Sequence, residues 1–160
     1  MSFQFDSKLI ECVEGELKPH SFQRMAETPK LPGVDVAAVW KRRNINMNRA
    51  VALLPFSDAS YNPGAFAQSI KVPLGKAIGY IPVLNELGLQ IIIAGPGLLA
   101  WSDDLSKFLD KINNQRVILQ SLHIVDLTAR DSASARTWGQ AITGRYQDAI
   151  ENGIKSFLRT

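Results

Sequence analysis

Two short apolar runs separated by helix-compatible sequence constrain the fold of this chain more than any other feature. The first run spans residues 49–56 and the second spans residues 87–97, and both are bounded by turn-forming residues. Two strands joined by a helix in this way form a right-handed βαβ crossover. The sequence therefore predicts an α/β (or α+β) fold, with helices packed on a single mixed sheet of four to five strands.

Helical periodicity begins close to the N-terminus. Apolar residues recur at the spacing of one helical face from Ser7 onward, either Asp6 or Ser7 can cap that helix, and Pro19 ends it. A second apolar stripe starts at Phe66 and is interrupted by Pro73. It predicts either one kinked helix or two shorter helices between the two apolar runs.

The rest of the chain alternates between strand and helix patterns. Residues 34–40 and 47–56 are rich in β-branched and small apolar side chains, and the asparagine-containing tract between them favours a hairpin turn. Residues 115–128 predict a further strand that is long enough to bend or bulge. Ser102 is a good N-cap for a helix running to about residue 113, and Asp131 or Ser132 is predicted to cap a final helix.

Length and composition favour an ordinary globular protein. A chain of 160 residues without an internal linker or repeat predicts one domain, residues 1–160. Its one cysteine, Cys12, cannot form an internal disulfide, and the first residues lack the pattern of a signal peptide, so we expect a cytoplasmic protein. The most apolar window, residues 87–101, is too short and too interrupted to span a bilayer, so we expect no membrane partner.

Sequence motifs for catalysis and cofactor binding are absent. The chain contains no G-x-G-x-x-G, no P-loop, no G-x-S-x-G and no metal-ligand spacing. We therefore expect no cofactor and no bound metal, catalytic residues cannot be named, and whether the protein is an enzyme stays open. His123 lies in a predicted strand without a nearby second ligand, which favours a hydrogen-bonded core residue.

One candidate ligand site lies where the parallel strands would end. Ligands of open α/β sheets bind in the crevice beyond the carboxyl ends of the strands. The small and acidic residues that leave the predicted strands are Asp58, Gly95, Gly97, Ser102 and Asp126. Carboxylates, accessible backbone and a capped helix N-terminus suit a phosphate or a metal-bound substrate. The same residue types also serve turns and caps in any α/β protein.

A second candidate site is the tip of the predicted hairpin. No acid occurs between Asp35 and Asp58, although four bases and a tryptophan do. These residues are Trp40, Lys41, Arg42, Arg43 and Arg49. Basic groups beside an aromatic ring suit phosphates and unstacked bases, as in sequence-tolerant nucleic-acid surfaces. The alternative is a solvated turn at the sheet edge, with Trp40 in the core.

The order of helix, hairpin, helix and strand over residues 7–95 resembles the core of the PD-(D/E)XK nuclease-like superfamily. Asp35 then stands where that family has its first acid. The second hairpin strand departs from the pattern, because residues 50–56 contain neither an acid nor a lysine. One carboxylate does not hold and orient a catalytic metal. The resemblance therefore implies a catalytically silent relative at most.

The leading functional hypothesis is a non-catalytic binding module that uses the basic hairpin against an anionic partner, with nucleic acid first among the candidates. One alternative is a small enzyme or ligand-binding protein that uses the crevice around Asp58, Gly95 and Asp126. Another is a structural subunit whose partner is a protein. We also expect a homo-oligomer, such as a homodimer, because apolar helices and edge strands offer self-complementary surfaces.

Overall fold

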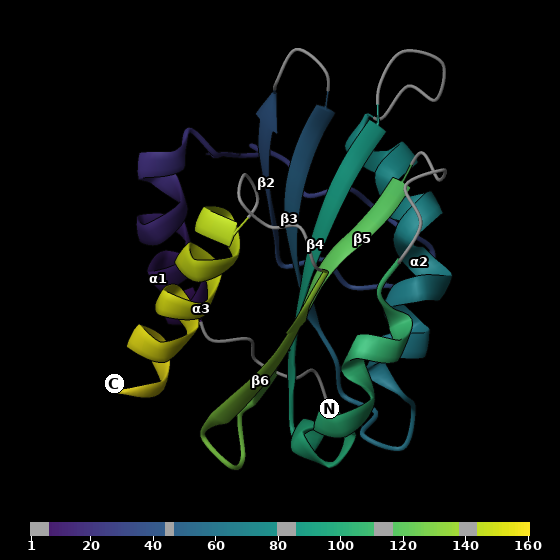
Figure 1. Cartoon of the computed structure of the whole chain (residues 1–160), viewed down its shortest axis with the longest axis vertical. Helices are drawn as coiled ribbons and strands as arrows, with labels where there is room; N and C mark the ends of the chain where they lie inside the picture. Colours follow the sequence, from purple (N-terminus) through teal and green to yellow (C-terminus); the bar gives the residue numbers. More distant parts are fainter. Residues whose placement is uncertain (1–6, 44–46, 80–85, 111–116, 138–143) are drawn as a thin grey trace.

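The computed structural model describes residues 7–43, 47–79, 86–110, 117–137 and 144–160. Its centre is one open sheet whose six described strands lie side by side in chain order (Figure 1). The strands are β1 (Gln23–Arg24), β2 (Ala38–Arg43), β3 (Met47–Pro55), β4 (Glu86–Gly95), β5 (Val117–Asp126) and β6 (Asp131–Arg136). Strands β3, β4 and β5 are parallel, and the strands on either side of them are antiparallel to their neighbours. The predicted α/β class with one mixed sheet is confirmed.

The helices also follow chain order. They are α1 (Ser7–Leu17), the short 3-10 helix η1 (Lys18–His20), α2 (Pro63–Ile78), the 3-10 helix η2 (Leu98–Phe108) and α3 (Gly144–Leu158). The predicted first helix and the βαβ crossover, which is β3–α2–β4, are confirmed. Helix α2 runs through Pro73 as one helix. It begins at the Asn62 cap and ends at Gly79, where φ is +98°.

Two sequence predictions about elements are wrong. The strand count is six in the described residues, because β1 and β6 were not predicted as strands. Asp131 begins strand β6, which pairs with β5 in a hairpin, and the last helix begins only at Gly144. Asp131 and Ser132 suit a tight turn as well as a helix cap, and pairing with the long strand β5 favours the turn. The predicted cap at Asp6 lies outside the described residues.

The sheet separates two hydrophobic cores. Helices α1 and α3 cover one face, and α2 with η2 covers the other (Figure 1). Alternating residues of β3 contribute to opposite cores: Val51 and Leu53 face α1 and α3, whereas Ala50 and Leu54 face α2. We call these the α3 face and the α2 face. None of the described helices is long and apolar enough to cross a membrane.

A β-bulge in β5 confirms the irregularity predicted for that strand. The β4–β5 register shifts between Leu89 and Gln90, so that Leu89 pairs with Leu119 and Gln90 pairs with Ser121. The bulge leaves Gln120 as the extra residue. Its side chain lies over Gly88, where an added Cβ would come within 2.5 Å of the Gln120 amide oxygen. Polar side chains thereby enter the α3 face near the hairpin end of the sheet.

Candidate anion-binding site

The hairpin β2–β3 sends its bases to opposite faces of the sheet. Lys41 lies on the α2 face, where its Nζ donates to the carbonyl oxygen of Ile78 at 2.8 Å. It therefore caps the C-terminal end of α2, where unpaired carbonyls favour a cation. Arg42 pairs across the hairpin with Arg49, and both side chains lie on the α3 face. The alternation of a β-strand thus divides the basic cluster that the sequence analysis treated as one.

Arg42 and Arg49, which we call the arginine pair, converge on Tyr146 of α3. Their guanidinium carbons lie 5.0 Å and 5.1 Å from the centre of its ring, within the range of cation–π interaction. Arg42 also donates a hydrogen bond to the Tyr146 hydroxyl. Phe22 and His20 pack edge-on against the same ring, with centroid distances of 5.3 Å and 5.5 Å. Tyr146 is therefore a fixed platform for two positive charges.

Burial of Arg49 raises the electrostatic cost of holding its charge close to that of Arg42. Arg49 is only 6% exposed, whereas Arg42 is half-buried. The pKa of Arg49 is lowered, first by burial, which Tyr146 opposes, and then by the positive charge of Arg42. Both guanidinium groups still stay charged at neutral pH. A bound anion relieves the repulsion between them, and guanidinium forks match the oxygens of phosphate and carboxylate groups.

Arg42 differs from other arginines of the chain in its partners. Arg136 forms ion pairs with Asp148 at 2.7 Å and Glu151 at 2.8 Å, and Arg24 forms one with Glu14 at 3.2 Å. Across the described residues, no carboxylate forms an ion pair with Arg42. The Arg42 guanidinium instead contacts the hydroxyl and the ring of Tyr146.

The two other residues predicted for this site stand apart from the arginine pair. Trp40 is completely buried in the core under α1 and α3, so its ring is not accessible to an unstacked base. This matches the alternative reading of Trp40 as a core residue. The side chain of Arg43 lies outside what the structure describes, although its backbone pairs with Asn48 at the end of β2.

At the predicted strand-end crevice, Asp126 is buried and its carboxylate accepts hydrogen bonds from backbone N–H groups. Its carboxylate accepts hydrogen bonds from the backbone N–H groups of Gly97 at 3.2 Å, Leu99 at 3.1 Å, Thr128 at 3.0 Å and Ala129 at 2.9 Å. Burial alone raises the pKa of Asp126, but the four donors outweigh burial and hold the pKa below 3.8. The carboxylate ties the β4–η2 turn to the β5–β6 turn.

Gly95 and Gly97 serve the same turns. A Cβ on Gly95 would lie 1.7 Å from the carbonyl oxygen of Phe56, so only glycine fits beside the chain leaving β3. Gly97 has φ of +71° and precedes η2. Ser102 lies inside η2 and not at its start, so the prediction of Ser102 as an N-cap is wrong. The early start of η2 follows from the turn at Gly97.

Asp58 is exposed and binds within its own loop. Its Oδ1 accepts from the backbone N–H of Ser60 at 3.0 Å and from the Ser60 hydroxyl at 2.5 Å. The hydroxyl bond, followed by the backbone bond, lowers the pKa of Asp58. Asp58 and Asp126 therefore accept hydrogen bonds from different segments of the chain. Each residue of the predicted crevice has a structural role here, and its role in ligand binding stays a prediction.

A polar network crosses the α3 face one strand away from the edge. His123 is fully buried, with Nε2 2.9 Å from the Ser121 hydroxyl and Nδ1 2.8 Å from the Ser134 hydroxyl. The Ser121 hydroxyl donates to Gln90 Oε1 at 3.1 Å. Burial, with a smaller effect from Arg136, lowers the pKa of His123 to about 3. The predicted hydrogen-bonded core histidine is confirmed.

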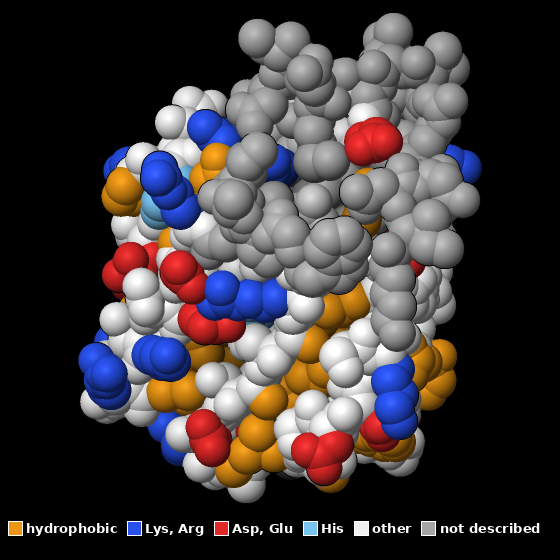
Figure 2. Space-filling model, viewed as in Figure 1, with side chains coloured by type: hydrophobic (Ala, Val, Ile, Leu, Met, Phe, Trp, Pro, Cys, Tyr) orange, Lys and Arg blue, Asp and Glu red, His pale blue; other side chains and the backbone are white. Residues whose placement is uncertain are grey.

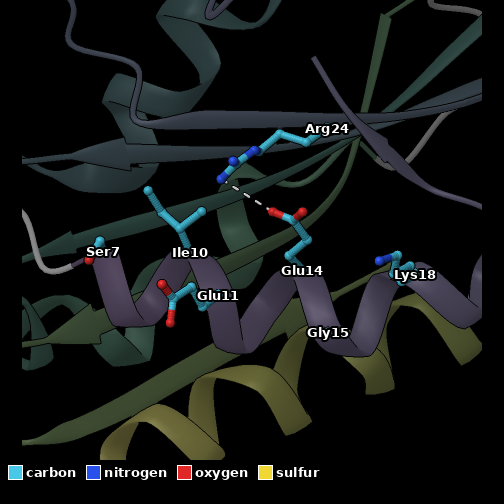
Figure 3. A pocket seen from close by; sticks show the side chains of 7 residues that line it. All are labelled: Ser7, Ile10, Glu11, Glu14, Gly15, Lys18 and Arg24. Carbon is cyan, nitrogen blue, oxygen red and sulfur yellow. Dashed lines mark ion pairs between the residues drawn. The ribbon is translucent and has the colours of Figure 1, made fainter. Parts of the chain in front are cut away.

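The outer side of α1 carries an open groove of about 480 Å³. Figure 3 shows Glu14 of α1 pointing toward Arg24 of β1, and their ion pair spans 3.2 Å. Ile10 and Gly15 give the groove some apolar surface, while its charged residues carry both signs. Because the pair is largely exposed and opposite charges compensate locally, the groove offers no concentrated charge for recognition.

Sequence reasoning missed Tyr146 as a site residue. Tyr146 lies on the buried side of α3, at 7% exposure. Nothing in the local sequence indicates that two arginines about a hundred residues away contact it. Strand alternation, in contrast, was a usable signal, because neighbouring residues such as Lys41 and Arg42 must face opposite sides.

Comparison with known proteins found no relative of this chain. The chain matches no protein-family model, no curated protein and no solved structure. The functional argument therefore depends on the geometry of the arginine pair itself.

Proposed function

We propose that this protein is a non-catalytic binding module that holds an anionic partner at the arginine pair, with nucleic acid first among the candidate partners. The observation that carries the proposal is the convergence of Arg42 and Arg49 on the ring of Tyr146. Two like charges held together, one of them buried, oppose each other in the free protein. An anion placed between them gains two charge-assisted contacts at once.

The framework around the pair supports this use. β2 and β3 are hydrogen-bonded strands, and a site built on strands holds its side chains more precisely than a loop does. The Tyr146 ring is fixed by Phe22 and His20. Preorganisation of this kind reduces the ordering cost of binding.

The test is fluorescence anisotropy of labelled single- and double-stranded DNA and RNA at several salt concentrations. Binding through phosphates predicts a negative log-log salt slope of about 0.7 per contact on single strands and about 0.9 on duplexes. Arg42→Gln removes one contact, so it weakens binding and reduces the slope by about that amount. Lys155→Gln removes the same charge from an exposed position near the far end of α3 and serves as the control.

Two results contradict the proposal. One is the absence of binding at low salt to every strand tested. The other is binding that responds equally to Arg42→Gln and to Lys155→Gln, since a diffuse charge effect does not need the arginine pair.

A further inference from the structure

The two edges of the sheet differ in their protection against pairing with another chain. Natural proteins protect an edge with a very short strand, charged side chains, a proline or a bulge. At one edge, β1 has only two residues, and one of them is Arg24. At the other edge, β6 has six residues, and its four central residues, 132–135, include neither a charge nor a proline. Its ladder with β5 keeps one register throughout. β6 is therefore the less protected edge of the sheet (Figure 1).

The backbone of β6 presents a row of hydrogen-bonding groups at this edge. The Thr137 N–H donates to the carbonyl oxygen of Gln120 at 2.9 Å, so the backbone of Thr137 faces β5. Alternate residues of an antiparallel strand face the same neighbour. The N–H and C=O groups of Ser132, Ser134 and Arg136 therefore point away from β5, toward the open side of the sheet.

These outward-facing backbone groups keep most of their hydrogen-bonding capacity. Within the part of the chain that the structure describes, one hydrogen bond involves them: the Ser132 N–H donates to Asp131 Oδ1 at 2.8 Å. Ser134, in the middle of the strand, is exposed although its hydroxyl lies 2.8 Å from His123 Nδ1. The middle of this edge is therefore accessible to another strand.

A second copy of β6 fits this edge. An antiparallel pair of identical strands has a twofold axis and is self-complementary. An axis at Ser134 pairs this residue with itself and places Ser132 opposite the partner's Arg136, so all three outward-facing residues join the ladder. Ala133 then lies opposite the partner's Ala135 in the pair where side chains come closest, and both are small. An axis at Ala133 would instead leave Arg136 opposite a residue of the β5–β6 turn.

The charges around β6 do not select a different kind of partner. Helix α3 packs beside β6, and Figure 2 shows acidic and basic side chains intermixed over α3 on the described part of the visible face. Arg136 itself forms ion pairs with Asp148 and Glu151 of α3. A surface of mixed sign favours neither a strongly acidic nor a strongly basic partner. The uncharged centre of β6 and its mixed surroundings suit a copy of themselves.

We infer that β6 pairs antiparallel with β6 of a second copy, about a twofold axis at Ser134, so that one sheet continues through a homodimer. The inference is independent of the proposed function, because Arg42 lies on β2, near the opposite edge of the sheet. A contact of six residues per strand is about 20 Å long and small by the standards of stable interfaces, so we expect a reversible dimer.

Disulfide cross-linking tests the register. Cys12→Ser supplies a background without a thiol, because Cys12 is the one cysteine of the chain. Ser134→Cys in that background places two thiols at the axis, where facing Cα atoms are about 5.5 Å apart and within reach of a disulfide. Ser132→Cys is the control, since its two copies are offset by four residues, about 13 Å along the strands. Under mild oxidation, Ser134→Cys is expected to form covalent dimers and Ser132→Cys to stay monomeric.

Sedimentation equilibrium over a range of protein concentrations tests the edge without a cross-link. Ser134→Pro removes an outward-facing N–H that β5 does not use, so it is expected to abolish the dimer. Ser134→Ala keeps that N–H and loses only the hydroxyl near His123, so it is expected to dimerise like the wild type. A thermal melt of each variant confirms that it is folded.

Three results overturn the inference. The first is a wild-type protein that stays monomeric at the highest soluble concentration. The second is equal cross-linking of Ser134→Cys and Ser132→Cys, or none in either. The third is a dimer that persists in folded Ser134→Pro. If Ser134→Pro does not fold, the two cysteine variants decide the question.

Discussion

At the scale of single residues, the charged side chains differ in the groups that surround them. Asp126 receives four backbone donors, and Arg136 has two carboxylates. Arg42 instead faces a tyrosine hydroxyl and a second arginine. A buried charge with a complete set of partners usually supports the fold, whereas the proposed binding site uses two like charges held close together.

Asp126→Asn tests the structural role of the crevice. The asparagine amide cannot accept four N–H donors with the strength of a carboxylate, so unfolding free energy should fall by about 2–3 kcal/mol. Asp58→Asn changes an exposed carboxylate of a local turn and should have a much smaller effect. Urea unfolding of both variants makes the comparison. An Asp126→Asn protein as stable as the wild type contradicts the assignment.

His123 predicts a dependence of stability on pH. Its pKa is about 3 in the folded protein against 6.5 for an ordinary histidine. Below pH 6.5 the unfolded chain therefore takes up a proton that the folded protein does not, and this lowers stability as pH falls. Between pH 6.5 and pH 5 the loss is about 1.5 kcal/mol. His123→Gln should flatten this part of the profile, as measured by urea unfolding at each pH. The same slope in the wild type and the variant contradicts the assignment.

At the scale of elements, an ion pair ties α2 to the end of η2 and the start of β5. Lys71 Nζ lies 2.8 Å from Asp110 Oδ2, and the two side chains are 10% and 7% exposed. Asp110 also accepts the backbone N–H of Leu119 at 2.7 Å. The pair therefore joins the crossover helix to the edge of the parallel strands.

Lys71→Met removes one partner and leaves a buried carboxylate, which should cost about 3–5 kcal/mol of stability. The double variant Lys71→Met, Asp110→Asn should lose less than the sum of the two single variants, because the second change removes the unpaired charge. Thermal or urea unfolding of the four proteins completes the cycle. Additive losses would mean that the two groups do not interact.

Elements were predictable where periodicity was strong and distant pairing did not matter. The apolar alternation and the helical stripe were sufficient for β3, α2 and β4. The residues of β6 are small and polar, so their local sequence suits a helix start as well as a turn, and only pairing with β5 decides between them. The basic tract indicated Arg42 and Arg49, but the contact with Tyr146 depends on how α3 packs on the sheet.

At the scale of the whole molecule, the two faces of the sheet differ in polarity. The α2 face has an apolar core with the buried Lys71–Asp110 ion pair beside it. The α3 face is apolar toward the carboxyl ends of the parallel strands and polar toward the β2–β3 hairpin, where Arg49, Gln90 and Gln147 are buried. Gln90 Nε2 and Gln147 Oε1 have no hydrogen-bond partner among the described residues, and unpaired buried polar atoms are costly to a fold. The polar half of this face is therefore where we place the binding site.

The most direct test of that placement is an NMR titration that follows arginine side-chain Nε–Hε signals as single-stranded DNA or RNA is added. The account predicts that the signals of Arg42 and Arg49 shift together with one midpoint, while the signal of Arg136, held by Asp148 and Glu151, stays in place. Signals of Arg42 and Arg49 that remain fixed while the strand binds elsewhere would contradict it.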